Sequence, residues 1–372
     1  MLHLISSTSF LGAERVVCEL ANHLDPARFE CVVGLIGSPE IVVEAVRHSL
    51  DCTHISVVHF PCTGKFSLAT ITSISDFMKN QHIDIVHSHG YKSNFYSQMA
   101  RLSANKVRAV ATNHNWITNS LSEKLYRFID LLVLKRYSRI VAVSEDLVKS
   151  MSAAGICPDQ IRLIMNGISL ANPPNATKSS EIRSKFGILN GCYVIGCVAS
   201  LIPVKAHADL LNAFSRLVKT IPDSMLLLIG DGPLHGDLKL MVQNLDFHDK
   251  VKFLGYRTDA RELYPAFDLF ALVSYSEGLP MAMLEAMAAA LPIVASAVGS
   301  IPQVICPMKN GILIKPGDID GIANSFIKLA QDPELRKSLG QNARSEVVTK
   351  YSVSRMARDY EQLYEKVLET SL

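Results

Sequence analysis

The sequence predicts an α/β protein of two doubly wound, Rossmann-like domains. Short β-rich runs alternate with helix-patterned segments in the first half of the chain, and the second half repeats this alternation. Between the halves, residues 170–187 are rich in proline, asparagine and serine, which is typical of a linker. With 372 residues, the chain is long enough for two domains that each bury a core.

The elements follow in order along the chain. In the first half, the strand candidates are residues 2–6, 30–37, 54–60, 84–90, 106–114 and 139–144, and the helix candidates are 13–24, 39–50, 68–80 and 92–102. In the second half, the strand candidates are 193–200, 224–232, 250–256, 269–274, 291–297 and 310–316, and the helix candidates are 206–220, 234–245, 258–267, 281–290 and 320–331. An amphipathic segment, 352–370, ends the chain. Parallel sheets bind ligands at the carboxyl ends of their strands, so the segments after the strands are the candidate sites.

Composition excludes several classes of protein. Eight scattered cysteines without a C-x-x-C pair favour reduced, buried thiols in a cytosolic protein over a disulfide framework or a zinc site. No apolar run reaches the roughly eighteen residues that a transmembrane helix needs. The first residues lack the basic region and cleavage signal of a secretory peptide. We therefore expect a cytoplasmic protein.

The net charge of +2 indicates little, but basic residues gather between residues 92 and 139. They are Lys92, Arg101, Lys106, Arg108, Lys124, Arg127, Lys135, Arg136 and Arg139. Because aromatic residues and a LLVL run are interleaved with them, this stretch is compatible with a face that rests on anionic lipid at the inner membrane surface. An ordinary solvated helix face is the favoured alternative. No nucleic-acid-binding module accompanies the charge, so nucleic acid is not an expected partner.

The most informative stretch is residues 274–285, in which an apolar strand leads through Glu277-Gly278-Leu279-Pro280 into an apolar helix. Pro280 fits a first helical turn, and the backbone N–H groups after it have no partners within the helix, which makes them a phosphate site. Gly278 lets that backbone approach a ligand closely. Glu285, the only ionisable residue of the helix, needs hydrogen-bond donors if it is buried. Sugar hydroxyls would supply them; a basic neighbour is the alternative.

This stretch resembles the E-x7-E region of retaining glycosyltransferases of family 4. The resemblance implies the GT-B fold, in which two Rossmann-like domains face an interdomain cleft. The resemblance implies that Glu277 contacts the donor sugar, that Glu285 binds the nucleotide ribose, and that Gly278, Leu279 and Pro280 belong to the donor site. It also implies an acceptor-binding domain over 1–168, a nucleotide-sugar-binding domain over 169–351, and a helix within 352–372 that crosses back to the first domain.

Two segments of the first half carry the same resemblance. Residues 10–17 are similar to the family's Gly-Gly-Ala-Glu-Arg turn, with Gly12 retained for the donor phosphate and Leu11 at the first glycine position. His89 ends the strand 84–90 and matches the histidine that lies against the donor sugar; His114 is the weaker alternative. A hydrogen-bonded structural histidine is the other interpretation of His89. His87 and His89 share a strand face, but no third ligand is apparent, so no metal site is expected.

The loop of residues 198–207 is similar to the family's Gly-Arg-Leu-x-x-x-Lys-Gly loop. Lys205 matches the lysine that faces the donor diphosphate, and a lysine is a compact charge suited to a leaving phosphate. Ser200 occupies the arginine position and Ala206 the glycine position. Because serine lacks the forked guanidinium, one source of positive charge is missing from this loop.

Other segments match the family in order and spacing. Gly230 lies in a GDGP turn, and Tyr256 ends a segment that runs beside the nucleotide base in relatives. Residues 298–303 resemble a loop that usually reads Gly-Gly-x-Pro-Glu. Asp318 and Asp320 look like a D-x-D metal motif, but their place at a helix start favours capping.

The resemblance implies a retaining transfer of a sugar from a nucleotide diphosphate, most often a UDP-sugar, to an acceptor hydroxyl. His89, Lys205 and Glu277 are the expected catalytic residues. The nucleotide sugar is a substrate, and neither cofactor nor metal is expected. The acceptor is a sugar, a lipid-linked molecule or a protein. The alternatives are a nucleotide-sugar epimerase or hydrolase on the same fold, and a non-catalytic partner that binds a nucleotide sugar.

Overall fold

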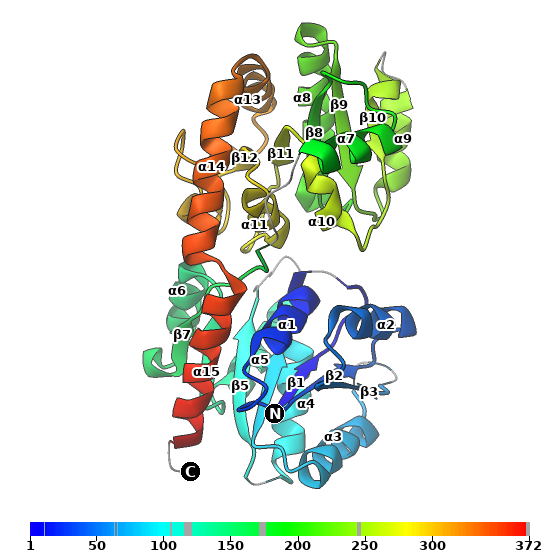
Figure 1. Ribbon diagram of the computed structural model, residues 1–372. Helices are drawn as coiled ribbons and strands as arrows, with labels where there is room; N and C mark the ends of the chain where they lie inside the picture. The colour runs from blue at the N-terminus through cyan, green and yellow to red at the C-terminus, as the bar shows by residue number, and fades with distance from the viewer. Residues whose placement is uncertain are drawn as a thin grey trace. The chain divides into compact units, whose positions relative to one another are not determined.

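The protein is described by a computed structural model that divides into two units (Figure 1). The N-terminal unit comprises Met1–Ser169 and Ser352–Leu372, and the C-terminal unit comprises Leu170–Tyr351. The structure describes residues 1–10, 12–62, 64, 66–104, 106–114, 121–170, 176–243 and 247–369.

The N-terminal unit is a parallel sheet with helices on both faces. Its elements are β1 (Leu2–Ile5), α1 (Gly12–His23), β2 (Cys31–Ile36), α2 (Glu40–Ser49), β3 (Ile55–Phe60), α3 (Leu68–Asn80), β4 (Ile85–His89), α4 (Tyr91–Arg101), β5 (Arg108–Asn113), α5 (Leu121–Leu134), β6 (Arg139–Ala142), α6 (Glu145–Ala153), η1 (Pro158–Gln160), β7 (Ile161–Leu163) and α15 (Val353–Glu369). The strand order is β3-β2-β1-β4-β5-β6-β7, so the chain reverses its direction of winding between β1 and β4. That switch point is where doubly wound sheets bind ligands.

The sheet is buried because its strands are apolar on both faces, as parallel strands require. One face packs on α3, α4 and α5 around residues such as Ile74, Tyr96 and Leu134, all fully or nearly fully buried. The other face carries the terminal helix α15. Tyr360 and Tyr364 of α15 reach the strands, with hydroxyls 2.9 Å from Thr112 Oγ1 and 2.7 Å from His87 Nδ1. These contacts fix α15 as part of the N-terminal unit.

The C-terminal unit is also a parallel sheet flanked by helices. Its elements are α7 (Ala176–Lys185), β8 (Tyr193–Val198), η2 (Pro203–Lys205), α8 (His207–Thr220), β9 (Ser224–Ile229), α9 (His235–Gln243), η3 (His248–Lys250), β10 (Val251–Phe253), α10 (Ala260–Leu263), η4 (Tyr264–Ala266), β11 (Leu269–Leu272), α11 (Met281–Ala288), β12 (Ile293–Ser296), α12 (Ile301–Val304), β13 (Ile312–Ile314), α13 (Ile319–Gln331) and α14 (Pro333–Lys350). The parallel sheet has the order β10-β9-β8-β11-β12-β13, with its switch point between β8 and β11. The prediction of two doubly wound sheets is confirmed.

Two sequence-based expectations need correction. The segment 170–187 is not simply a linker, because part of it forms α7. Arg183 of α7 donates to the Asp268 carboxylate at 2.8 Å, which ties the helix to the start of β11. The predicted helix 281–290 ends at Ala288, since Ala290 has a left-handed φ of 58°. Pro280 is the N-cap residue with extended backbone rather than a member of the first turn.

The cysteine expectation holds in part. All eight cysteines are free, but Cys52, Cys157 and Cys306 are exposed rather than buried. Within the described part of the chain, no helix has the length and apolar character to cross a membrane.

Candidate donor site and the histidine cluster

Two loops flank the switch point of the C-terminal sheet. One follows β8 and carries Ser200 and Lys205; the other follows β11 and leads to α11. The backbone joins them, because the Tyr275 N–H donates to the Val204 carbonyl at 2.8 Å. Neighbouring strands that wind in opposite directions leave a crevice at this point, so both loops lie where a nucleotide is expected in a doubly wound sheet.

Lys205 and Glu277 form an ion pair across these loops. Lys205 Nζ lies 2.6 Å and 2.7 Å from the two Glu277 carboxylate oxygens. Ser274 Oγ donates to the same carboxylate at 2.6 Å. The Glu277 side chain is only 6% exposed, whereas that of Lys205 is 21% exposed. An ammonium has three donors, and a carboxylate uses two here, so Lys205 retains capacity to bind a phosphate oxygen.

The residue after Lys205 shows why the related loops have a glycine there. Ala206 adopts a left-handed conformation with φ 52° and ψ 38°. A residue with a Cβ bears a strain of about 1–2 kcal/mol in that region. The loop thus keeps the conformation that a glycine would favour, and Lys205 keeps its place.

Glu285 lies one turn into α11 and is 6% exposed. Arg261 Nε donates to one of its carboxylate oxygens at 2.8 Å, and the Tyr264 hydroxyl donates to the other at 3.0 Å. A basic neighbour therefore satisfies this buried acid, as one of the two sequence-based alternatives proposed. Any ribose hydroxyl at Glu285 would add to these bonds through the remaining lone pairs.

Glycines bring the other motif segments against the same loops. A Cβ on Gly230, which has φ +139°, would overlap the carbonyl oxygen of Ala199. A Cβ on Gly299 would likewise overlap the carbonyl oxygen of Glu277. The Gly230 N–H donates to the Gly255 carbonyl at 2.9 Å, and the adjacent Tyr256 is 50% exposed. The GDGP turn and the loop 298–303 thus adjoin the Lys205 and Glu277 loops, and the segment ending at Tyr256 adjoins the GDGP turn.

Both carboxylates of the D-x-D sequence have partners within the C-terminal unit. The Asp318 carboxylate caps α13 by accepting from the Gly321 N–H at 2.8 Å, and Asp320 pairs with Arg216. The capping interpretation is confirmed for Asp318, whereas Asp320 lies in the first turn of α13.

The remaining sequence-based candidates belong to the N-terminal unit. Gly12 begins α1; Leu11, at the first glycine position, lies outside the described residues. His89 ends β4 at the switch point and is 3% exposed. The candidate residues therefore form one group around Lys205 and Glu277 in the C-terminal unit and a second around His89 in the N-terminal unit.

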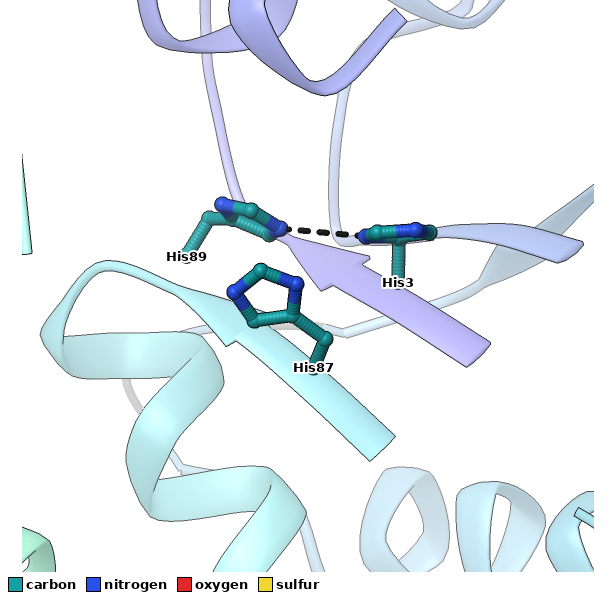
Figure 2. A group of neighbouring side chains, drawn as sticks. All are labelled: His3, His87 and His89. Carbon is teal, nitrogen blue, oxygen red and sulfur yellow. Dashed lines mark hydrogen bonds between the residues drawn. The ribbon is translucent and has the colours of Figure 1, made fainter. Parts of the chain in front are cut away.

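His89 lies in a chain of imidazoles. Its Nε2 is 3.3 Å from His3 Nδ1, as the dashed line in Figure 2 shows, and its Nδ1 is 3.4 Å from His114 Nε2. His87 packs beside His89 with ring centroids 4.1 Å apart. Burial, followed by the charges of His87, His3 and His114, lowers the pKa of His89 well below 6.5. The rings are therefore neutral near pH 7.

His3 is a member of this cluster that the sequence did not predict. His3 of β1 is in register with His87 of β4 because the two strands are neighbours, and this places a third histidine beside the pair. Both His87 ring nitrogens are already engaged at 2.7 Å, by the Tyr364 hydroxyl and by Thr112 Oγ1. A metal ion at this cluster would have to displace such bonds, and among the described residues the group that could hold it consists of the three histidines, with no carboxylate to offset its charge. The cluster fits a hydrogen-bonded network better than a metal centre.

Two doubly wound sheets, with a lysine, an acid and a helix amino end at the switch point of the second, are the arrangement expected of a GT-B enzyme that acts on nucleotide sugars. Comparison with known families agrees. Residues 11–172 match the model of Glycosyltransferase Family 4, and residues 178–346 match that of Glycosyl transferases group 1. The chain belongs to glycosyltransferase family 4.

Several curated proteins are similar along most of their length. The N-acetyl-alpha-D-glucosaminyl L-malate synthase of Bacillus anthracis is 27% identical over 324 residues, which cover 86% of this chain and 84% of that protein. The UDP-Gal:alpha-D-GlcNAc-diphosphoundecaprenol alpha-1,3-galactosyltransferase of Escherichia coli is 26% identical over 322 residues, covering 84% and 81%.

Solved structures share the fold. The Anabaena protein HepE in complex with UDP-glucose superimposes with a TM-score of 0.87 at 22% identity, covering 98% of this chain and all of that one. The sucrose-phosphate synthase of Thermosynechococcus elongatus gives a TM-score of 0.83 at 18% identity, with complete coverage of both chains. At these identities the likeness supports the GT-B fold and nothing finer.

Proposed function

We propose that this glycosyltransferase moves a sugar from a UDP-sugar to an acceptor hydroxyl with retention of the anomeric configuration, in glycan, polysaccharide or glycolipid assembly. The observation that carries the proposal is the convergence of Lys205, Glu277 and the loop before α11 at one switch point. A UDP-sugar stands in the name of the Escherichia coli relative, and the Anabaena neighbour was solved with UDP-glucose.

Each candidate residue has a physical task in this proposal. Lys205 and the first-turn N–H groups of α11 stabilise the charge on the departing diphosphate, with Gly278, Leu279 and Pro280 shaping that turn. Glu277 orients the donor hydroxyls. His89, catalytic with these two, lies against the sugar. The donor contacts are completed by Gly12, Ser200, Gly230, Tyr256 and Glu285.

The bond changes are few. The acceptor oxygen bonds to the anomeric carbon as the bond from that carbon to the diphosphate oxygen breaks, and the hydroxyl proton passes to the departing phosphate on the same face. Lys205 and the helix N–H groups supply the positive potential, so the transfer proceeds without metal or cofactor. Ser200 leaves the loop with less positive charge than an arginine would give.

A donor screen followed by product analysis tests this proposal. Binding of the cognate nucleotide sugar to the folded protein raises its thermal midpoint, by an increment that grows with the ratio of ligand concentration to Kd. Incubation with an acceptor then gives a glycoside whose anomeric coupling, measured by NMR, matches that of the donor. Conversion of the donor alone would indicate an epimerase or a hydrolase. Binding without turnover over a broad acceptor panel would indicate a non-catalytic partner.

The acceptor class is also part of the proposal. The names of the two relatives contain L-malate and a diphosphoundecaprenol-linked sugar. We propose that the acceptor is a sugar, a lipid-linked sugar or a protein hydroxyl, and that the transfer takes place in the cytoplasm. A lipid-linked acceptor would place the enzyme at a membrane surface.

The outer face of α5 supports a peripheral membrane contact. Leu125, Phe128, Ile129 and Leu132 recur at helical spacing and are 58%, 60%, 38% and 45% exposed. The exposed cations Lys135 and Arg136 follow the helix. An apolar stripe next to cations is suited to an anionic bilayer surface. Retention by phosphatidylglycerol vesicles at low salt, weakened by Phe128→Ser, supports this contact; no retention at low salt contradicts it.

A further inference from the structure

A cavity opens at the switch point of the N-terminal sheet. Its volume is about 690 Å³, and its wall includes Ser6–Thr8 after β1, Gly37 after β2 and His89–Lys92 after β4. The carboxyl ends of three strands therefore meet at one hollow, which is the usual location of a ligand in this type of sheet. The cavity is formed by the N-terminal unit alone, and His89 is part of its wall.

Lys92 gives this cavity a positive charge. Its Nζ lies 3.6 Å from the position that a Cβ on Gly37 would occupy and 6.0 Å from the centre of the Tyr96 ring. Among the described residues, Lys92 pairs with no carboxylate. Asp130 also lines the wall, but it is 3% exposed and accepts a hydrogen bond from Asn94 Nδ2 at 2.8 Å.

The first turn of α4 adds to this positive potential. Gly90, with φ +92°, is the N-cap residue, and the Asn94 N–H closes the first turn on its carbonyl. The N–H groups that precede Asn94 in that turn have no helical partner. A half-buried ammonium beside such a helix start is suited to a phosphate group.

Aromatic rings form the rest of the wall. Tyr91 and Tyr126 are stacked, with centroids 5.4 Å apart and planes at 16°, and Phe66 meets Phe95 edge to face at 6.0 Å. Tyr91 and Phe66 are 57% and 53% exposed, so part of each ring remains accessible to a ligand. Sugar rings and apolar chains pack on such surfaces, which a small inorganic ion would not need.

The resemblance to family 4 already implies that the acceptor binds in this unit, and we infer that this cavity selects acceptors carrying a phosphate group. Lys92 and the start of α4 would hold the phosphate, with the sugar ring on the aromatic wall beside His89. This inference rests on the proposed transferase function and adds the chemical class of its acceptor. The phosphate is not consumed: the acceptor hydroxyl attacks the donor as described above, and the phosphate only positions it.

Binding of glucose 1-phosphate and of neutral glucose to the full-length protein, measured by calorimetry, tests the inference. Lys92→Met is expected to weaken glucose 1-phosphate binding at least tenfold, whereas Lys92→Arg retains most of it. Lys79→Met removes an exposed lysine of α3 in the same unit and is expected to change nothing. Equal binding of glucose 1-phosphate by Lys92→Met and wild type, or no preference of the wild type over glucose, overturns the inference.

Two further measurements complete the test. The donor-induced rise in the thermal midpoint should be the same in Lys92→Met and wild type, since the donor motifs around Lys205 are unchanged. If that rise is missing in both proteins, the proposed transferase function fails instead. Comparison of glucose 1-phosphate with its dodecyl phosphodiester identifies the source of the phosphate: tighter binding of the diester indicates a lipid-linked acceptor, and equal binding a soluble one.

Discussion

Lys205 and Glu277, which are 72 residues apart in sequence, form a two-pronged ion pair with distances of 2.6 Å and 2.7 Å. The Ser274 hydroxyl completes the environment of the carboxylate. This pair joins the loops after β8 and β11. It holds in position the ammonium and the carboxylate that we assign to the donor diphosphate and the donor sugar.

Removing one member of the pair is expected to destabilise the C-terminal unit. Lys205→Met leaves the buried Glu277 carboxylate without its cation, at a cost of about 3 kcal/mol. The double variant Lys205→Met/Glu277→Gln removes the unpaired charge and should recover much of that loss. Hydrogen exchange of peptides covering β11 and α11 measures the effect. A double variant as unstable as the single one would contradict the pairing.

Glu285→Gln is expected to weaken donor binding. The substitution removes the charge that holds Arg261 and, in the proposed function, the ribose hydroxyls. The loss of a hydrogen bond to a charged group is worth about 1.5–3 kcal/mol, which corresponds to roughly a tenfold or greater rise in the donor KM. Asp268→Asn is the control, because Asp268 pairs with Arg183 in the same unit outside the donor motifs. A KM that rises equally in both variants would indicate a purely structural role.

Gly230→Ala should lower both stability and donor affinity. The added Cβ would overlap the Ala199 carbonyl, and the φ of +139° disfavours any side chain. Such strain costs about 1–3 kcal/mol. Gly236→Ala is the matched control: a Cβ there meets no atom within 4 Å, and alanine favours helix α9 by up to about 1 kcal/mol. Thermal midpoints with and without UDP measure both effects. A Gly230→Ala protein with the same midpoints as wild type would contradict the close approach of Gly230 to the Ala199 carbonyl.

The histidine cluster predicts lower stability in acid. Burial lowers the pKa of His3 to about 3 and that of His114 to about 4, from 6.5. Below pH 6.5 the unfolded chain therefore binds protons that the folded chain does not. The free energy of unfolding falls as the pH drops from 6.5 through 4, by at most about 1.4 kcal/mol per pH unit for each group.

His3→Gln removes one of these groups. In urea unfolding, it should reduce the slope of the free energy of unfolding against pH by the contribution of one proton. His48→Gln, which changes an exposed histidine on α2, should leave the slope unchanged. The same slope in His3→Gln as in wild type would show that His3 takes up its proton equally in both states.

Much of the architecture was predictable, because alternating apolar strands and amphipathic helices specify parallel sheets wherever they occur. Helix α7 was missed since its short polar turns follow prolines and carry little helical periodicity. His3 was not predicted as a site residue, because the sequence around it indicated only a strand. Only the order of strands, with β1 beside β4, brings it to His87 and His89.

The candidate site was predictable only in its motif residues. Lys205 and Glu277 each lie in a sequence motif that can be recognised locally. Their pairing depends on the loops after β8 and β11, which only the strand order brings together. Arg261 and Tyr264 gave no local signal of binding Glu285, because partners of a buried acid are chosen by packing rather than by spacing. The cavity near Lys92 likewise depends on where three strands end.

The most direct test of the account is the single-turnover rate of sugar transfer in Lys205→Ala and Glu277→Ala, with Arg183→Met as a control for loss of an ion pair. The account predicts a fall of about 100-fold or more in each of the first two variants, because charge on the leaving diphosphate is no longer stabilised or the sugar no longer oriented. The control keeps its rate. Wild-type transfer rates in both Lys205→Ala and Glu277→Ala would contradict the assignment of this site.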